Sequence, residues 1–186
     1  LIILFFAGVV LSFAQAPYHL WPLLFVSFGL FYFLYAQAQT KSQAFLTGFI
    51  FAFGYFVVGL SWIGNALLVE GNVYKWAWPL AVIALPALLS LFTALYTTIA
   101  HIAFTKTRFG GFLGVCVCLG VSEWVRGYIF TGFPWNLYGY SWINVLPIAQ
   151  SVSVIGPYGL TLLTIFWGSL VGFCSLDIAA RKYVLA

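Results

Sequence analysis

Apolar residues run through this chain in long blocks, and short polar or proline-containing stretches separate one block from the next. A helix needs about 20 apolar residues to cross the hydrocarbon core of a bilayer. The blocks therefore predict an all-α, polytopic transmembrane helix bundle of about six spans. We expect these spans at residues 1–14, 23–36, 44–60, 78–104, 110–130 and 147–176.

Charged residues make up only 5% of the 186 residues, whereas hydrophobic residues make up 64%. A soluble domain carries about 25% charged residues, which cover its water-facing surface. The composition therefore indicates an integral membrane protein that contacts membrane lipids. The net charge of +4 comes from basic residues spread thinly along the chain. Because phosphate binding needs a basic face, we expect no nucleic-acid partner.

The positions of the basic residues predict how the bundle is oriented. If the loops alternate between the two sides of the membrane, one side receives five of the seven Lys and Arg residues: Lys41, Lys106, Arg108, Arg181 and Lys182. The other side receives Lys75, and Arg126 lies near it. Since cytoplasmic loops carry the excess of positive charge, we expect a cytoplasmic N-terminus.

Three loops then face outwards, and they hold most of the Trp, Tyr, Pro and Asn residues between the blocks. These loops are residues 15–22, 61–77 and 131–146. Binding residues gather in loops that a rigid scaffold holds in place. We therefore expect the functional site on the outer face.

Two of the few charges, Glu123 and Arg126, lie inside an apolar block. Their spacing of three residues places them on one face of a helix, where they can pair. One hypothesis is a buried ion pair that locks the helix and the loop after it. The other is that Arg126 binds an anionic group such as a lipid phosphate, since its planar guanidinium group can donate two parallel hydrogen bonds.

The stretch that follows, Thr131 to Asn136, cannot form a regular helix. Gly132 and Pro134 interrupt it, and Phe133 precedes a proline, which favours extended backbone. Irregular backbone at membrane depth is tolerated only inside protein or beside a water-filled cavity. An aromatic belt at the membrane surface is one interpretation. We favour a lip that contacts lipid, with Trp135 at its centre.

The sequence does not predict a metal site or a cofactor. His19 and His101 have no second ligand at metal spacing, and Cys116 and Cys118 have the spacing of neither a zinc pair nor a redox pair. The count of three cysteines, with Cys174, does not suggest a disulfide framework. No complete set of catalytic residues is evident in the chain.

Several motifs nevertheless resemble one family, the bacterial apolipoprotein N-acyltransferases. The resemblance is carried by Glu123-Trp124-Val125-Arg126-Gly127, by Phe130-Thr131-Gly132-Phe133-Pro134-Trp135-Asn136 and by Gly139-Tyr140. It extends to Ala16-Pro17-Tyr18-His19-Leu20-Trp21-Pro22 and Gly156-Pro157-Tyr158-Gly159-Leu160, in the family's order along the chain.

The resemblance implies an inner-membrane enzyme without a cofactor. Such an enzyme transfers an acyl chain from a phospholipid donor to the α-amino group of the N-terminal diacylglyceryl-cysteine of an apolipoprotein. It uses a Glu-Lys-Cys triad in a periplasmic nitrilase-like domain, which follows a seventh span. We therefore expect residues 1–186 to be the transmembrane N-terminal domain of a larger protein, without the triad and inactive by itself.

The resemblance also implies roles for individual residues. Trp135 matches a tryptophan that lines the family's lipid-access portal, and Glu123 and Arg126 match a charged pair at the outer end of the preceding helix. Phe133, Pro134 and Tyr140 belong to the same motif and complete the expected substrate-binding set. Two other functions are compatible with the pattern, a small-molecule transporter and a membrane module for anchoring or assembly.

Overall fold

The structure, a computed structural model, describes residues 1–104, 108–129 and 132–184, and within these ranges it contains helices and no strands. The α-helices are α1 (Ile2–Ser12), α2 (Leu23–Tyr35), α3 (Lys41–Gly59), α4 (Trp62–Leu67), α5 (Leu85–Phe104), α6 (Arg108–Arg126), α7 (Leu146–Ala149) and α8 (Val152–Val184). Two 3₁₀-helices, η1 (Lys75–Ala77) and η4 (Tyr138–Trp142), and a π-helix, η2 (Leu80–Ala84), complete the list. The predicted all-α class is confirmed.

Among the described residues, four helical segments are long and apolar enough to cross a membrane. They are Lys41–Gly59, Lys75–Phe104, Phe109–Arg126 and Val152–Leu176. The first two predicted spans correspond to shorter apolar helices, α1 and α2, of 11 and 13 residues. The predicted end of the fifth span, at residue 130, and the predicted cytoplasmic Lys106 lie outside the described residues.

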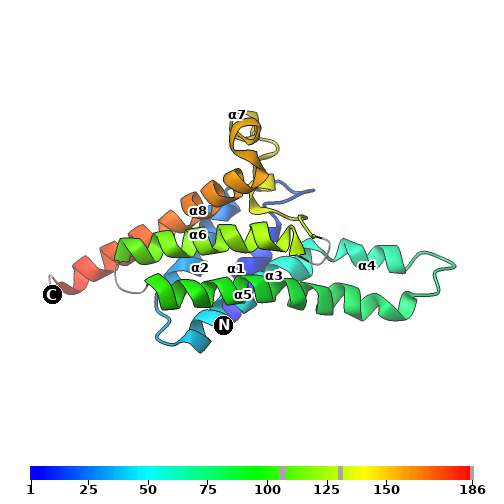
Figure 1. Ribbon diagram of the computed structural model, residues 1–186, viewed down its shortest axis with the longest axis horizontal. Coiled ribbons are helices and arrows are strands. Elements are labelled where there is room, and N and C mark those ends of the chain that lie inside the picture. The colour runs from blue at the N-terminus through cyan, green and yellow to red at the C-terminus, as the bar shows by residue number, and fades with distance from the viewer. Residues whose placement is uncertain (105–107, 130–131, 185–186) are drawn as a thin grey trace.

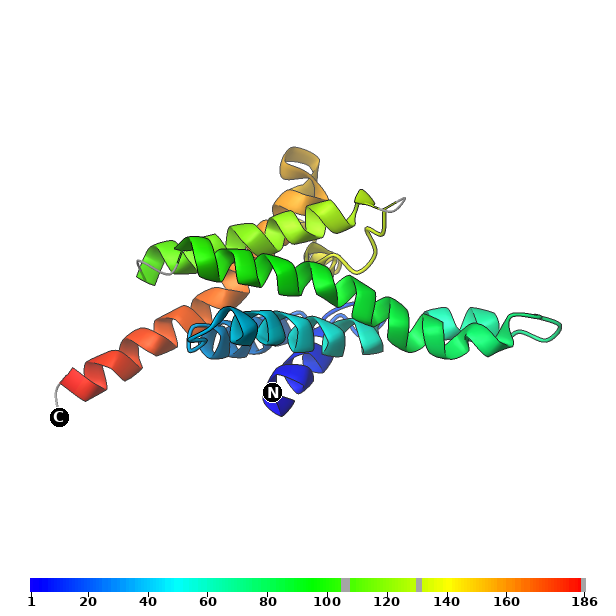
Figure 2. The same cartoon turned by 60° about the horizontal axis from the view of Figure 1, so that its bottom comes forward.

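The six longer helices form a closed ring when their contacts are followed from one to the next. α1 packs on α3, α3 on α5, α5 on α6, α6 on α8, α8 on α2, and α2 on α1. Figures 1 and 2 show these helices lying side by side. Most long helices that follow one another in the chain are therefore neighbours in the ring, and the exception is the pair α2 and α3.

Glycines allow some of these helices to meet backbone to backbone. A Cβ atom at Gly54 of α3 would collide with the carbonyl oxygen of Phe5 in α1, and one at Gly8 would collide with that of Phe51. On the other side of the ring, a Cβ at Gly172 of α8 would collide with the carbonyl oxygen of Gly29 in α2. Small residues at such positions are typical of helix packing in membranes.

Aromatic side chains fill the interior of the ring. The rings of Phe31 and Phe51 lie 4.5 Å apart, and Phe28 contacts Tyr138 edge to face at 5.0 Å. Tyr55 also packs on Tyr138, at 5.1 Å. Tyr138 comes from the segment after α6, so this loop contributes a side chain to the core.

Two of the predicted loops contain helices that the sequence pattern did not reveal. Residues 61–77 include α4 and η1, and residues 131–146 include η4 and the start of α7. These helices are only three to six residues long, so they carry too few turns for a periodic pattern. α8 is interrupted at Gly156, directly before Pro157, where the backbone has φ 70° and ψ 172°.

A helical arm projects beyond the bundle on the side opposite the C-terminus (Figure 1). It consists of α4 and of the stretch from Lys75 to Ala84, which runs antiparallel to α4. α4 contacts η2 of this stretch. The continuous segment Lys75–Phe104 has 30 residues, a length of about 45 Å. This exceeds the hydrocarbon thickness of about 30 Å, so the segment is longer than an upright span requires.

Candidate functional site

The three loops that were predicted to share the outer face meet at one end of the ring. The side-chain amide of Gln15, from the first loop, donates to Ser141 Oγ in the third at 2.9 Å. Trp62, from the second, stacks on Trp135 of the third. We call this region the loop end, and it also contains the C-terminal ends of α3 and α6.

Glu123 and Arg126 form the predicted ion pair in the last turn of α6. Arg126 Nη2 lies 2.6 Å from Glu123 Oε2, and Arg126 Nε donates to Oε1 at 3.3 Å. Both residues are 1% exposed, and the guanidinium also lies over the ring of Phe56 at 5.1 Å. A buried charge requires such a partner, since an isolated one is costly to remove from water.

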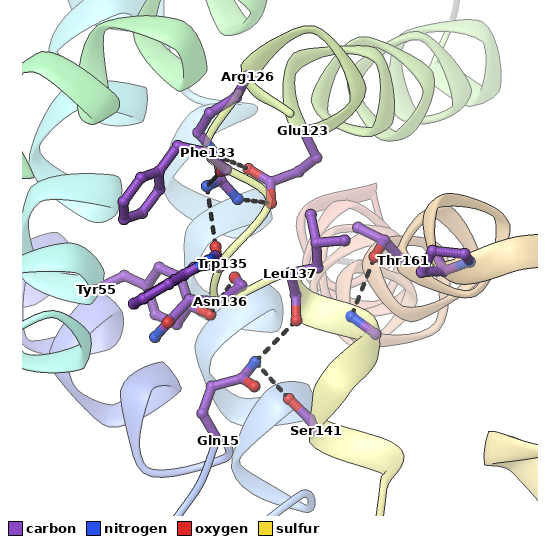
Figure 3. A network of polar contacts seen from close by, with 12 residues as sticks. Gln15, Tyr55, Glu123, Arg126, Phe133, Trp135, Asn136, Leu137, Ser141 and Thr161 are labelled. Carbon is purple, nitrogen blue, oxygen red and sulfur yellow. Dashed lines mark hydrogen bonds and ion pairs between the residues drawn. The ribbon is translucent and has the colours of Figure 1, made fainter. Parts of the chain in front are cut away.

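The remaining nitrogen of Arg126 binds the backbone of the loop rather than another side chain. Nη1 donates to the carbonyl oxygens of Phe133 at 2.5 Å and of Trp135 at 2.9 Å (Figure 3). All three guanidinium nitrogens therefore have protein partners. This geometry corresponds to the first of the two hypotheses for the pair, in which it locks the helix to the following loop.

The next two carbonyl groups along the loop are also bound by side chains from other elements. The hydroxyl of Tyr55, on α3, donates to the Asn136 carbonyl at 2.7 Å. The amide of Gln15 donates to the Leu137 carbonyl at 3.2 Å. We call the segment Phe133–Leu137 the ledge. Four carbonyl groups of its irregular backbone thus accept hydrogen bonds from side chains of three parts of the chain, and buried backbone at membrane depth needs such partners.

Two residues of the loop have backbone angles in the left-handed region. Gly132 has φ 84°, and a Cβ there would collide with the carbonyl oxygen of Gly127, so this turn requires glycine. Asn136 has φ 55°, which asparagine tolerates better than most residues. Its side-chain amide donates to the carbonyl oxygen of Gly59 at 3.2 Å, which ties the ledge to the end of α3.

Trp135 points away from the core and pairs with Trp62, the first residue of α4. Their rings are nearly parallel, with centroids 5.0 Å apart and an interplanar angle of 12°. Both side chains are 48% exposed. The ring of Phe133 lies 5.6 Å from that of Trp135, and Pro134 between them is half-buried. The structure therefore brings three of the predicted site residues together.

An apolar groove of about 680 Å³ begins beside this tryptophan pair and runs between α3, α4 and η2. It is lined by Phe53, Val57, Ser61, Trp62, Asn65, Leu68, Trp78, Val82 and Ile83. Most of these side chains are hydrocarbon or aromatic, and Ser61 and Asn65 are the two polar ones. The groove suits a long apolar ligand better than a polar one.

Beyond the ledge, the chain turns into η4, which anchors it in the ring. Tyr138 is buried, and burial, with the nearby Glu123 carboxylate, raises its pKa well above 10. The indole nitrogen of Trp142 donates to Thr164 Oγ1 of α8 at 2.8 Å. Tyr140, the remaining predicted site residue, lies on η4 with its side chain exposed.

The cysteines lie on the membrane-spanning helices. Cys116 and Cys118 are buried in α6, and Cys174 is exposed on α8. Within the described ranges, no group of three or more His, Cys, Asp or Glu side chains is placed to hold a metal ion.

Known proteins include relatives that match this chain over most of its length. Residues 7–170 match the N-terminal domain of apolipoprotein N-acyltransferase. The chain belongs to the apolipoprotein N-acyltransferase family. It is 43% identical over 169 residues to the apolipoprotein N-acyltransferase of Rhodopseudomonas palustris, an overlap of 88% of this chain and 31% of the relative. Identities to the proteins of Bradyrhizobium diazoefficiens and Brucella suis are 42% and 40%, over 86% and 87% of the chain.

The chain thus spans about a third of the length of the curated apolipoprotein N-acyltransferases that it matches. The apolar helices and the membership in this family together indicate a membrane protein. The matched region, residues 7–170, includes the whole ledge and the ion pair, so the loop end belongs to the family's N-terminal domain.

Four residues of the loop end were not among the predicted site residues: Gln15, Tyr55, Trp62 and Asn136. Their partners are distant in the sequence, with Tyr55 and Asn136 separated by 81 residues. No local pattern reports such a contact. The clue that could have drawn attention to Asn136 is its place directly after Pro134-Trp135, since asparagine is favoured where a turn needs positive φ.

Proposed function

We propose that this chain is the membrane part of an apolipoprotein N-acyltransferase, and that its loop end receives the lipid substrates. The acyl donor is a phospholipid, and the acceptor is an apolipoprotein with an N-terminal diacylglyceryl-cysteine. The observation that carries the proposal is the stacking of Trp135 on Trp62, which lines an apolar groove, within a domain of this family. Both substrates carry acyl chains, which such a groove would accept from the bilayer.

The site residues have two kinds of role in this proposal. Trp135, with Phe133, Pro134 and Tyr140, contacts acyl chains at the membrane surface. Glu123 and Arg126 hold the ledge in place and do not touch the substrate. The buried position of the pair and its hydrogen bonds to the ledge support this division. The bond-making Glu-Lys-Cys triad belongs to a nitrilase-like domain outside this chain.

The orientation in this proposal follows the positive-inside rule. Lys41 and Arg108 begin α3 and α6 at the end of the ring opposite the loop end, and α8 carries Arg181 and Lys182 to the same end (Figure 1). That end is cytoplasmic, and the loop end is periplasmic in the bacterial inner membrane. The lipid substrates and the periplasmic domain would then meet on one face.

Replacing Trp135 by alanine in the full-length protein tests the proposal. The variant is expected to lower the rate of acyl transfer from vesicle phospholipid to a diacylglyceryl lipopeptide by about tenfold at limiting phospholipid, equivalent to about 1.4 kcal/mol. Membrane insertion should be unchanged, because half of the side chain is exposed. The matched control is Trp124→Ala, since Trp124 is 51% exposed on α6 and contacts Tyr128 instead of Trp62.

Two outcomes would contradict the proposed role of Trp135. A Trp135→Ala protein with normal turnover and a normal dependence on phospholipid concentration would exclude a substrate contact at this position. A Trp124→Ala protein as impaired as Trp135→Ala would show a general need for tryptophan at the membrane surface.

A further inference from the structure

We infer that Tyr55 is a positioning residue for Trp135, and that it acts through the backbone of Asn136. This inference rests on the proposed function, because it concerns how the tryptophan pair is held where the lipid substrates would bind. Tyr55 lies in the membrane-spanning part of α3, one turn before the end of the helix at Gly59.

The Tyr55 hydroxyl is a fixed donor. The side chain is 0% exposed, and its ring is packed between Phe56 and Tyr138, with centroid distances of 5.1 Å to each. This packing restricts the orientation of the Tyr55 ring. The hydroxyl donates to the carbonyl oxygen of Asn136 at 2.7 Å, a short distance for an O–H···O bond.

Asn136 is attached to α3 at a second point, at the last residue of the helix. Its side-chain amide donates to the carbonyl oxygen of Gly59, three residues before Trp62 in the chain. Trp62 follows the end of α3 in the chain, and Trp135 is connected to the same helix through its neighbour Asn136. This shared support explains why the two rings lie nearly parallel at 5.0 Å.

Arg126 supplies the opposing restraint, from α6. Its bonds to the carbonyl oxygens of Phe133 and Trp135 fix the ledge relative to α6, whereas Tyr55 and Asn136 fix it relative to α3. The ledge thus bridges two helices. Loss of the Tyr55 hydroxyl removes one restraint next to Trp135 while leaving the ion pair, the ring packing and Trp135 itself intact.

The test uses Tyr55→Phe and Tyr35→Phe in the full-length protein in lipid nanodiscs, labelled with 5-fluorotryptophan. Tyr35 is the matched control, because its buried hydroxyl also donates to a backbone carbonyl, that of Thr97 in α5, at 2.9 Å. In ¹⁹F spectra, Tyr55→Phe should shift or broaden the resonances of Trp135 and Trp62 and leave that of Trp124 unchanged. Tyr35→Phe should leave all three unchanged.

Acyl transfer provides the second readout. Tyr55→Phe should lower kcat/KM for the phospholipid donor by about threefold to tenfold, as expected for one lost neutral hydrogen bond. The loss should vanish in a Trp135→Ala background, because a residue that acts through Trp135 has nothing left to position. Equal losses in both backgrounds, or unchanged Trp135 and Trp62 resonances, would overturn the inference.

Asn136→Gly gives an independent version of the test if Tyr55→Phe fails to fold. Glycine accepts the positive φ at this position but lacks the amide that binds Gly59. The variant should move the same two resonances, and unmoved resonances would contradict the inference. The spectra detect a change at Trp135 even if Trp135→Ala shows normal acyl transfer. Normal transfer would therefore contradict the proposed function, whereas unmoved Trp135 and Trp62 resonances would contradict the role of Tyr55.

Discussion

The body of the ring and its loop end are held together by different means. In the body, α1 meets α3 and α2 meets α8 at glycines, where the backbones are so close that even a methyl group would collide. At the loop end, the backbone of the ledge is irregular, and four of its carbonyl groups accept hydrogen bonds from the side chains of Arg126, Tyr55 and Gln15.

The difference reflects what each backbone can do for itself. A helix satisfies its own N–H and C=O groups, so in lipid it can associate by close packing alone. The ledge lacks this regular pairing, and four of its carbonyl groups accept hydrogen bonds from side chains in other parts of the chain. Packing therefore fixes the body of the ring, and directional hydrogen bonds from distant side chains fix the loop end. Variants at three places in the molecule probe this comparison, in order of expected effect.

The largest effect is expected at Arg126. Arg126→Ala leaves the Glu123 carboxylate buried without its partner and should lower the free energy of unfolding by about 3–5 kcal/mol. Arg126→Lys keeps the charge but cannot bind the carboxylate and two carbonyl groups together, so its loss should be smaller. Thermal unfolding in detergent micelles would measure both.

A double variant separates charge balance from loop support at this site. Glu123→Gln with Arg126→Gln removes both charges and should be more stable than Arg126→Ala. A double variant as unstable as Arg126→Ala would mean that the lost bonds to the ledge, rather than the unpaired carboxylate, dominate the cost.

An intermediate effect is expected in the body of the ring. Gly54→Ala places a methyl group against the carbonyl oxygen of Phe5, and separating α1 from α3 should cost about 1–3 kcal/mol. Gly29→Ala is the control, since its Cβ would first meet the Cβ of Val171, at 3.3 Å, which is a side-chain contact. Equal losses of unfolding free energy in the two variants would argue against backbone contact as the cause.

The smallest effect is expected from the tryptophan pair. A double-mutant cycle of Trp62→Ala and Trp135→Ala should give a coupling of about 0.5–1.5 kcal/mol in unfolding free energy, because the rings stack in parallel. The same cycle with Trp62 and Trp124 should give no coupling. Additive losses for Trp62 and Trp135 would show that the stack contributes nothing to the stability of the loop end.

Several features of this molecule could be predicted because they depend on neighbouring residues. The ion pair of Glu123 and Arg126 follows from a spacing of three on a helix, and the break in α8 follows from Gly156-Pro157. The short helices α4, η1, η4 and α7 could not be predicted, because three to six residues carry no periodic signal.

The sequence by itself determined that the chain is an all-helical membrane protein, which residues belong to the motifs of its family, and that Glu123 and Arg126 lie on one face of a helix, where they can pair. These properties arise from composition and from contacts within one turn of helix. Only the tertiary structure decided that Arg126 supports the ledge, that Tyr55 and Gln15 bind its carbonyl groups, and that Trp62 stacks on Trp135. Those partners are 81 residues apart for Tyr55 and 122 for Gln15, and they meet only because the helices close into a ring.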